Sequence, residues 1–458
     1  MEQADGLLPV RLHGLDEHGL DKEENHMRRG RWTRLAVLLA TVIGLIAVAL
    51  PVSAGSDNGN SNAPTVRFAT FNASLNRNFD GQLQIDLGVP GNAQADAVAE
   101  IIQRTRPDVL LINEFDFDDG NASLDGFHDN YLMEPHGTAA PIDYPFRYSA
   151  PSNTGIHSGL DLNNDTLFDP VASPFNFVYA DDSFGFGWFP GQFGMAVYSM
   201  YPIDFDNVRT FQNFLWKDMP GALLPVNPDG SPFYSPDQIA IFRLSSKSHW
   251  DLPIEIGNKT VHFLVSHPTP PVFDGPEDRN GTRNHDEIRF WADYVGPGKN
   301  RGSYIYDDAG QFGGLKPGSL FVIAGDENSD PLDGDSIPGS IQQLLDNPNV
   351  NDKSTPSSLG GTEQSALQGN ANTLHLSDPA FDTADFFDGF PPPPFGGAPG
   401  NLRADYVLPG KALQIRDAGV FWPLSGDPLF SLVGTFPFPA SDHRLVWVDV
   451  SHGGFPKG

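Results

Sequence analysis

Cysteine is absent from the 458-residue sequence. Its absence excludes disulfide bonds, a thiol nucleophile and any Cys-ligated metal site. The fold must therefore be stabilised by its core alone. Hydrophobic residues make up 39% of the chain and include 34 phenylalanines, enough for a sizeable core.

Basic residues are scarce, with 28 Lys and Arg against 58 Asp and Glu, for a net charge of -30. A surface this acidic repels nucleic-acid backbones at long range, which argues against a protein that stays bound to DNA or RNA. It does not exclude a nuclease, because bound cations reverse the local sign of the potential. The acidity is explained either by solubility or a salty habitat, or by dedicated divalent-cation sites.

An apolar run of 16 residues, 35–50, has the features of an export signal. Arginines precede it from Met27 onward, and the small residues Val52-Ser53-Ala54 follow it. The run is shorter than the ~20 residues that usually span a membrane. We expect Met27 to be the true start, because the acidic residues 1–26 suit no signal, and we expect cleavage after Ala54. The alternative is a membrane anchor formed by residues 35–50.

The predicted organisation is an N-terminal extension and signal at 1–54, a polar linker at 55–64, and one elaborated domain at 65–452. Removing residues 1–54 removes seven acidic and six basic residues, so the net charge becomes -29 and the acidity belongs to the domain. The 48 Gly and 41 Pro indicate many turns around strands. Insertions are expected near 115–190 and 329–400.

Short apolar strands alternate with helical patterns, which is typical of a layered α/β fold. Helices are predicted at 93–104, 284–295 (with Asn284 as the N-terminal cap) and 341–345. Strands are predicted at 66–72, 109–112, 193–199, 238–244, 261–267, 319–324, 403–408 and 444–450.

Polar residues recur at the ends of these apolar runs, and the set suits hydrolysis of a phosphate ester. A hard divalent ion prefers carboxylate oxygens, a carboxylate orients or deprotonates water, and His and Asn donate to phosphoryl oxygens. Singly, such an Asp or Asn is more often a turn residue and such a His a structural hydrogen-bonder. The residues are Asn72, Glu114, His267, Asp326, Asn328, Asp405, Asp442 and His443.

Seven sequence blocks in order resemble the endonuclease/exonuclease/phosphatase family, which includes deoxyribonuclease I, and the likeness is greatest to its exported bacterial branch. The most specific are Gly325-Asp326-Glu327-Asn328 and Ser441-Asp442-His443. The others are Thr70-Phe71-Asn72, Leu111 to Glu114, Gly194 to Ile203, Val265-Ser266-His267 and Arg403 to Val407.

The resemblance implies a four-layer α/β/β/α sandwich of two mixed sheets and a Mg²⁺- or Mn²⁺-dependent phosphoric ester hydrolase. Glu114 would be the main metal ligand, with Asn72 and Asp442 near the metal. Asp326 would activate water, Asn328 and Asn72 would contact the phosphate, and His443, oriented by Asp405, would bind it. His267 would be a second donor that protonates the leaving oxygen.

Two positions depart from the family pattern. Some members carry an acidic metal ligand two residues after the first Asn, where this chain has Ser74. Deoxyribonuclease I uses a Glu to hold the histidine that corresponds to His267, and the nearest position here is Gln192, which can accept a hydrogen bond without charge. No counterpart of that enzyme's DNA-contacting arginine is evident.

A second metal site is suggested by Asp161, Asn163 and Asp165, which begin a D-x-N-x-D calcium loop. Thr166 replaces the usual Gly and Ala172 the usual Glu, so a full EF-hand is not expected. The alternatives are another kind of Ca²⁺ loop or an acidic surface turn. Residues 330–335 are a further candidate for the substrate mouth or a second ion.

The leading hypothesis is an exported phosphatase or phosphodiesterase that acts on small phosphate esters. A secreted endo- or exonuclease is the alternative, with nucleic acid only as substrate, and a non-catalytic binding protein on the same scaffold comes third. No protein partner is evident from the sequence.

Overall fold

The computed structural model describes residues 64–298, 301–386 and 399–456, all within one unit that spans 60–458. The predicted export signal, its predicted cleavage site and the alternative anchor at 35–50 lie outside the described residues. Among the described helices, none is both long and apolar enough to cross a membrane.

The first sheet has six strands in the order β12-β13-β1-β2-β4-β3. β1 and β2 are parallel, with Asn72 paired to Asn113, so both strands end at one edge of the sheet. Asn72 and the residue after β2, Glu114, therefore start as neighbours. The strands are β1 (Thr65–Asn72), β2 (Val109–Asn113), β3 (Phe146–Tyr148), β4 (Met195–Ser199), β12 (Gln414–Val420) and β13 (Val446–Ser451).

The second sheet has five strands in the order β11-β8-β7-β6-β5. β7 and β8 are parallel, whereas β11 runs antiparallel to β8 and pairs Asp405 with Asp326. This register places Asp405 and Asp326 at one edge of the sheet with His267, which follows β7. The strands are β5 (Arg209–Thr210), β6 (His249–Ile256), β7 (Lys259–Ser266), β8 (Leu320–Asp326) and β11 (Asp405–Pro409).

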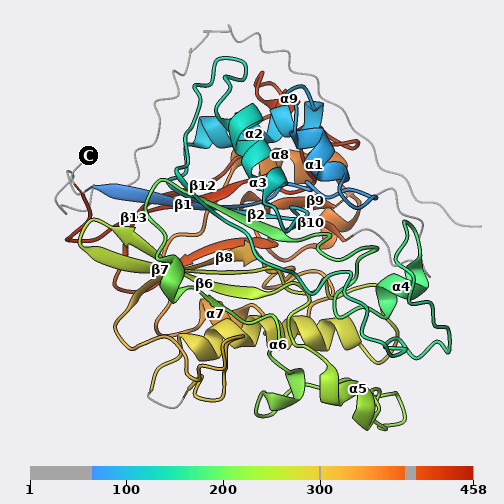
Figure 1. Cartoon of the computed structure of the whole chain (residues 1–458). Helices are drawn as coiled ribbons and strands as arrows, with labels where there is room; N and C mark the ends of the chain where they lie inside the picture. The colour runs from blue at the N-terminus through green and yellow to red at the C-terminus, as the bar shows by residue number, and fades with distance from the viewer. Residues whose placement is uncertain (1–63, 299–300, 387–398, 457–458) are drawn as a thin grey trace, which may run out of the picture. The chain divides into compact units, whose positions relative to one another are not determined.

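The two sheets pack face to face, with helices on both outer faces (Figure 1). Phe68 of the first sheet and Phe263 of the second contact each other between the sheets, with ring centroids 5.5 Å apart. α2 (Ala93–Thr105) covers the first sheet, and α6 (Arg279–Tyr294) covers the second through a second aromatic core. The predicted four-layer sandwich of two mixed sheets is confirmed.

The remaining elements are short and lie mainly in the connections and insertions. A small sheet pairs β9 (Ala384–Phe386) with β10 (Gly400–Leu402). The other helical segments are α1 (Gln82–Leu87), α3 (Ala122–Phe127), η1 (His128–Leu132), α4 (Phe177–Asp181), η2 (Phe205–Asn207), η3 (Trp216–Asp218), α5 (Pro236–Ile241), α7 (Gln342–Leu345), α8 (Leu359–Gln368), η4 (Asn370–Leu374), η5 (Pro379–Phe381) and α9 (Phe430–Val433).

The strand predicted at 238–244 is wrong, because this segment begins as helix α5. Ser235 and Gln238 form a reciprocal capping box with Pro236 at the first helical position, a local start signal that outweighs the apolar composition. The strand of this region is β6, which the sequence analysis missed because Pro253 interrupts its pattern. β5 pairs only with residues 250–251, so Pro253 removes no hydrogen bond to that strand.

The predicted cap at Asn284 is also wrong, because α6 begins at Arg279 and Asn284 lies inside it. Its buried side chain donates to the carbonyls of Thr269 and Glu327, both at 2.9 Å, and so ties α6 to the loops after β7 and β8. The other predicted strands, and the helices at 93–104 and 341–345, are present with ends shifted by at most two residues.

Candidate active site

Asn72 connects the two sheets at their shared edge. Its side-chain nitrogen donates to Oδ2 of Asp326 at 3.0 Å, and its amide also hydrogen-bonds to Glu114. Asn113 also connects the two sheets, because its Oδ1 accepts from the backbone N–H of Asp326 and its Nδ2 donates to the Ser266 carbonyl. The polar residues that end β1, β2, β7 and β8 are thereby brought into one site.

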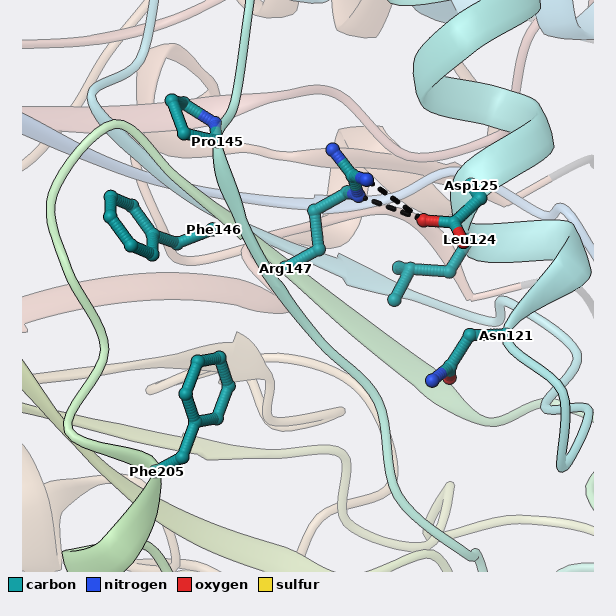
Figure 2. Close-up of a pocket in the computed structure, with 7 residues that line it drawn as sticks. All are labelled: Asn121, Leu124, Asp125, Pro145, Phe146, Arg147 and Phe205. Carbon is teal, nitrogen blue, oxygen red and sulfur yellow. Dashed lines mark hydrogen bonds and ion pairs between the residues drawn. The ribbon is translucent and has the colours of Figure 1, made fainter.

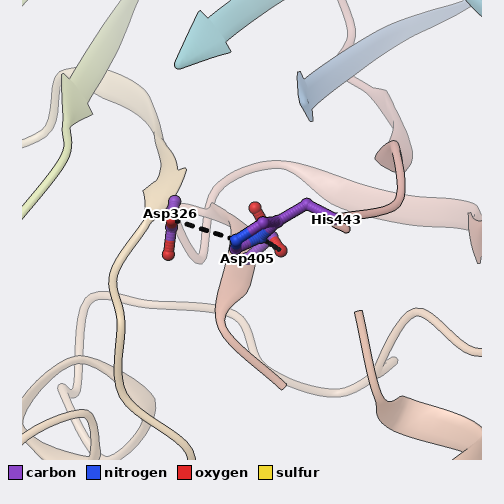
Figure 3. A group of neighbouring side chains, drawn as sticks. All are labelled: Asp326, Asp405 and His443. Atoms are coloured by element: carbon purple, nitrogen blue, oxygen red, sulfur yellow. Dashed lines mark hydrogen bonds and ion pairs between the residues drawn. The ribbon is translucent and has the colours of Figure 1, made fainter. Parts of the chain in front are cut away.

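His443 and Asp405 form an oriented pair (Figure 3). The Nδ1 atom of His443 lies 2.8 Å from Oδ2 of Asp405, and the Thr383 hydroxyl donates to the same oxygen at 2.8 Å. Burial lowers the pKa of His443, but Asp405 and Asp326 outweigh burial and raise the pKa well above its usual value. The imidazole is therefore held as a cation whose Nε2 faces Asp326 at 3.7 Å.

Asp326 occupies the centre of the site. Its Oδ2 lies 3.4 Å from Nε2 of His267, and its Oδ1 accepts the backbone N–H of Asn328 at 3.0 Å. Burial raises the pKa of Asp326 and the His443 cation opposes this shift. A buried carboxylate between two imidazoles is suited to hold or accept a proton from water.

Glu114 and Asp442 supply oxygen ligands that suit a divalent cation. Burial and the neighbouring Asp442 raise the pKa of Glu114, which accepts a hydrogen bond from Asn76 at 2.8 Å. Neither carboxylate is ion-paired to Lys or Arg within 4.0 Å in the described part of the chain. Two neighbouring acids without such a cation, beside the amide of Asn72, fit a hard divalent ion. Ser74 cannot contribute charge and instead donates to Asp442 at 3.4 Å.

The tightest group of acidic and histidine ligand atoms in the described residues is a different one. Ligand atoms of Asp326, Asp405 and His443 all lie within 4.8 Å of one another. This group is one candidate metal centre, in which Nδ1 of His443 is engaged by Asp405 and Nε2 is the remaining ring nitrogen. The oxygens of Glu114, Asp442 and Asn72 are the other candidate.

The expected partner of His267 is wrong. The Gln192 side chain accepts from the backbone of Trp188 and donates to the carbonyl of Arg77, each at 2.7 Å. Nδ1 of His267 is buried without a hydrogen-bond partner in the described residues. Burial, with Lys247 and His443, lowers its pKa well below the usual value. Burial therefore favours the neutral form of the His267 imidazole, and its role as the proton donor to the leaving oxygen stays a prediction.

Lys247 is a site residue that the sequence analysis missed. It is 6% exposed and lies in the loop before β6. Its ammonium forms no hydrogen bond or ion pair among the described residues, yet it interacts electrostatically with Glu287, Glu114 and Asp326. Burial lowers its pKa. The sequence around Lys247 contains no motif, so only the tertiary fold shows that this lysine lies near the acids. An alignment of relatives with a basic residue at this position before β6 is the signal that would have identified it.

The insertion after residue 329 contributes to the site through β9 and the residue before it. Thr383 holds Asp405, and the ring of Phe386 contacts the ring of His443 edge to face at 5.4 Å between centroids. The backbone of Asp385 also donates to the carbonyl of Asp442 at 2.7 Å. This segment therefore forms part of the surroundings of His443. Neither Thr383 nor Phe386 belongs to a motif.

A shallow pocket lies elsewhere and contains none of these residues (Figure 2). Arg147 and Asp125 form an ion pair within it, with 2.9 Å between Nη2 and Oδ1. The remaining lining residues are Asn121, Leu124, Pro145, Phe146 and Phe205. The pocket does not contribute to the chemistry of the site.

Comparison with known proteins agrees with this arrangement. The family model described as the Endonuclease/Exonuclease/phosphatase family matches residues 69–443. No curated protein matches the chain.

Several solved structures are similar to the chain at low sequence identity. The endonuclease/exonuclease/phosphatase of Beutenbergia cavernae DSM 12333 is 14% identical with a TM-score of 0.41, over 86% of this chain and 73% of that one. The human Nocturnin catalytic domain with bound sulfate is 14% identical with a TM-score of 0.41, over 85% of this chain and 96% of that one. The beta toxin of Staphylococcus aureus is 16% identical with a TM-score of 0.39, over 84% of this chain and 99% of that one.

The family match covers most of the chain and spans every residue of the site from Asn72 to His443. The chain therefore belongs to the endonuclease/exonuclease/phosphatase family, whose members hydrolyse phosphate esters.

Proposed function

We propose that the chain is an exported, divalent-cation-dependent hydrolase of small phosphate esters, a phosphatase or phosphodiesterase. The observation that carries this proposal is the buried Asp326 between His443 and His267, beside the carboxylates of Glu114 and Asp442. The arrangement supplies a proton acceptor, a fixed cation and hard metal ligands within one site.

The chain's own residues have distinct roles in this reaction. Asp326 orients water and takes its proton, while the His443 imidazolium, held by Asp405, binds a non-bridging phosphoryl oxygen. Lys247 contributes a second positive charge to the same group, and the amides of Asn72 and Asn328 contact it. Without substrate these amides donate to Asp326 and to the Pro268 carbonyl, respectively. A divalent cation, Mg²⁺ or Mn²⁺, held by Glu114, Asp442 and Asn72 supplies Lewis-acid polarisation of the phosphoryl oxygen.

Charge favours a small substrate over duplex DNA. The mature net charge of -29 leaves little attraction for a long phosphate backbone, and many arginines of the described residues are already ion-paired, among them Arg77 with Asp86 at 2.6 Å. Phe386 and Thr383 also contact His443 and Asp405, so this part of the site is already occupied by protein side chains. A secreted nuclease is the second candidate, and a non-catalytic binding protein is disfavoured because the whole set of acids and histidines is present.

The substrate class is tested with the purified 55–458 chain. It is assayed with Mg²⁺, Mn²⁺ or Ca²⁺ on a phosphomonoester, a phosphodiester and plasmid DNA in parallel. We expect hydrolysis of the small esters, and we expect EDTA to abolish it. The Glu114→Gln variant should need a higher metal concentration for half-maximal activity, because one ligand charge is lost. Plasmid cleavage at rates that rival those on small esters would make the chain a nuclease. Metal-independent turnover would contradict the assigned centre.

Export is proposed from the arginines, the apolar run and Ala54 near the N-terminus. N-terminal sequencing of the protein recovered outside the expressing cells is expected to start at Gly55. An intact residue before Gly55, with the protein retained in the membrane fraction, would support the anchor alternative instead.

A further inference from the structure

An acidic group outside the active site joins the loop 161–165 to the end of α4. The backbone N–H of Leu162 donates to Oδ1 of Asp182 at 2.7 Å, which places the Asp182 carboxylate against the loop. Asp161 and Asp165 come from the loop, and Asp181 and Asp182 come from α4 and the residue after it. Two segments thus direct four carboxylates toward one region.

Two carboxylate oxygens of this group are buried without a donor. Asp182 is 1% exposed, and its Oδ2 has no hydrogen-bond partner among the described residues. Oδ1 of Asp161 is likewise buried and unpartnered. Such oxygens are costly unless a proton, a water molecule or a cation satisfies them, and each one in a folded protein needs a specific explanation.

The charge balance favours a cation at this place. Burial, together with the charges of Asp161, Asp165 and Asp181, raises the pKa of Asp182 to about 6, and the hydrogen bond from Leu162 opposes this shift. The basic residue that acts on Asp181 is Arg279, which also pairs with Glu277. Negative charge therefore exceeds positive charge around the Asp182 carboxylate.

The loop backbone also has the geometry of a calcium loop. Thr166 occupies the position usually held by glycine, and it has the left-handed φ of 69° that this position requires. Its N–H donates to Oδ2 of Asp161 at 2.9 Å, which turns the loop around the first acid. Ala172 cannot supply the acid expected at the twelfth position, whereas the carboxylate of Asp182 reaches the loop from α4.

We propose that Asp161 and Asp182 bind a Ca²⁺ ion, with oxygens of Asn163 and Asp165, main-chain carbonyls and water completing the shell. Ca²⁺ accepts six to eight oxygens in flexible geometry, whereas Mg²⁺ demands a regular octahedron and keeps its waters. The acids of this loop and of α4 are not among the groups of three or more acidic and histidine ligand atoms that lie within 4.8 Å of one another in the described residues, so amide and carbonyl oxygens are needed. The ion would tie the loop to α4 in the insertion that precedes β4.

The site is tested by calorimetric Ca²⁺ titration of the EDTA-stripped 55–458 chain in excess Mg²⁺, which saturates the active centre. Thermal unfolding is followed under the same conditions. We expect one Ca²⁺ to bind and to raise Tm. Asp182→Asn and Asp161→Asn should raise Kd at least about tenfold and abolish the Tm shift. Asp237→Asn, an exposed acid in the neighbouring α5, is the matched control and should bind Ca²⁺ like the wild type.

Two results would overturn the proposal. One is the absence of Ca²⁺ binding by the wild-type chain in excess Mg²⁺, and the other is an unchanged Kd in the two variants. If the buried Asp182→Asn chain fails to fold, the exposed Asp165→Asn chain provides the same comparison. Because the readouts are binding and Tm, they remain informative whatever substrate the active site hydrolyses.

Discussion

Asp326→Asn is expected to lower kcat by about 10³-fold on the preferred small ester, within the range typical of a lost general base. The amide keeps the size of the side chain but cannot accept the proton of water, and it removes the negative charge that faces His443 and His267. Metal affinity should change little, because Glu114 and Asp442 remain. Steady-state kinetics and a metal titration of the same preparation measure both quantities.

A chemically identical change elsewhere separates the loss of the base from a general effect of Asp→Asn. Asp346 is exposed at the end of α7, and Asp346→Asn should retain wild-type kcat and Tm. A kcat for Asp326→Asn within tenfold of the wild-type value, in a folded and metal-binding protein, would remove Asp326 from the reaction.

Lys247→Met is expected to lower kcat/KM by about 10²-fold, at the lower end of the loss typical of a donor to developing negative charge. Methionine keeps the approximate length of the side chain but removes its ammonium group. This group interacts electrostatically with Glu114 and Asp326 in the site. Inorganic phosphate should also inhibit the variant more weakly, because product and transition state share the phosphoryl oxygens. Lys247→Arg keeps the charge and should retain part of the activity.

The inhibition constant for phosphate distinguishes binding from a purely structural role. Lys247 also interacts with the buried Glu287, which accepts the backbone N–H groups of Ser246 and Thr269, so its loss can lower Tm. If Tm falls while the phosphate inhibition constant stays unchanged, Lys247 only balances the charge of Glu287. Lys316→Met, at an exposed position, is the matched control for the loss of one lysine.

The candidate site shows where sequence reasoning succeeds. Asn72, Glu114, His267 and Asp326 each follow or end a short apolar strand, and parallel pairing brings such ends to one edge. The ordered blocks of the family then supplied roles for Asp405, Asp442 and His443. All of these residues meet in the structure, although their roles in the reaction remain predictions.

Local signals also explain where sequence reasoning failed. The segment from Pro236 has apolar composition that suits a strand, but the capping box at Ser235 starts a helix. In β6 the reverse holds, because Pro253 interrupts the pattern of a strand that tolerates it where β5 no longer pairs. In both cases the secondary structure depended on a single residue, whose effect is set by the residues around it.

The sequence by itself determined the fold class, the strand-end acids and histidines and the calcium-loop motif, because strand periodicity, turn chemistry and ordered motifs are local properties. Only the tertiary structure decided that Lys247 interacts with the acids of the site, that Gln192 bonds to Trp188 and Arg77 and not to His267, and that Asp182 accepts the backbone N–H of Leu162. These relations join segments distant in the chain. Their electrostatics depend on burial and on distances between side chains, which no local pattern contains.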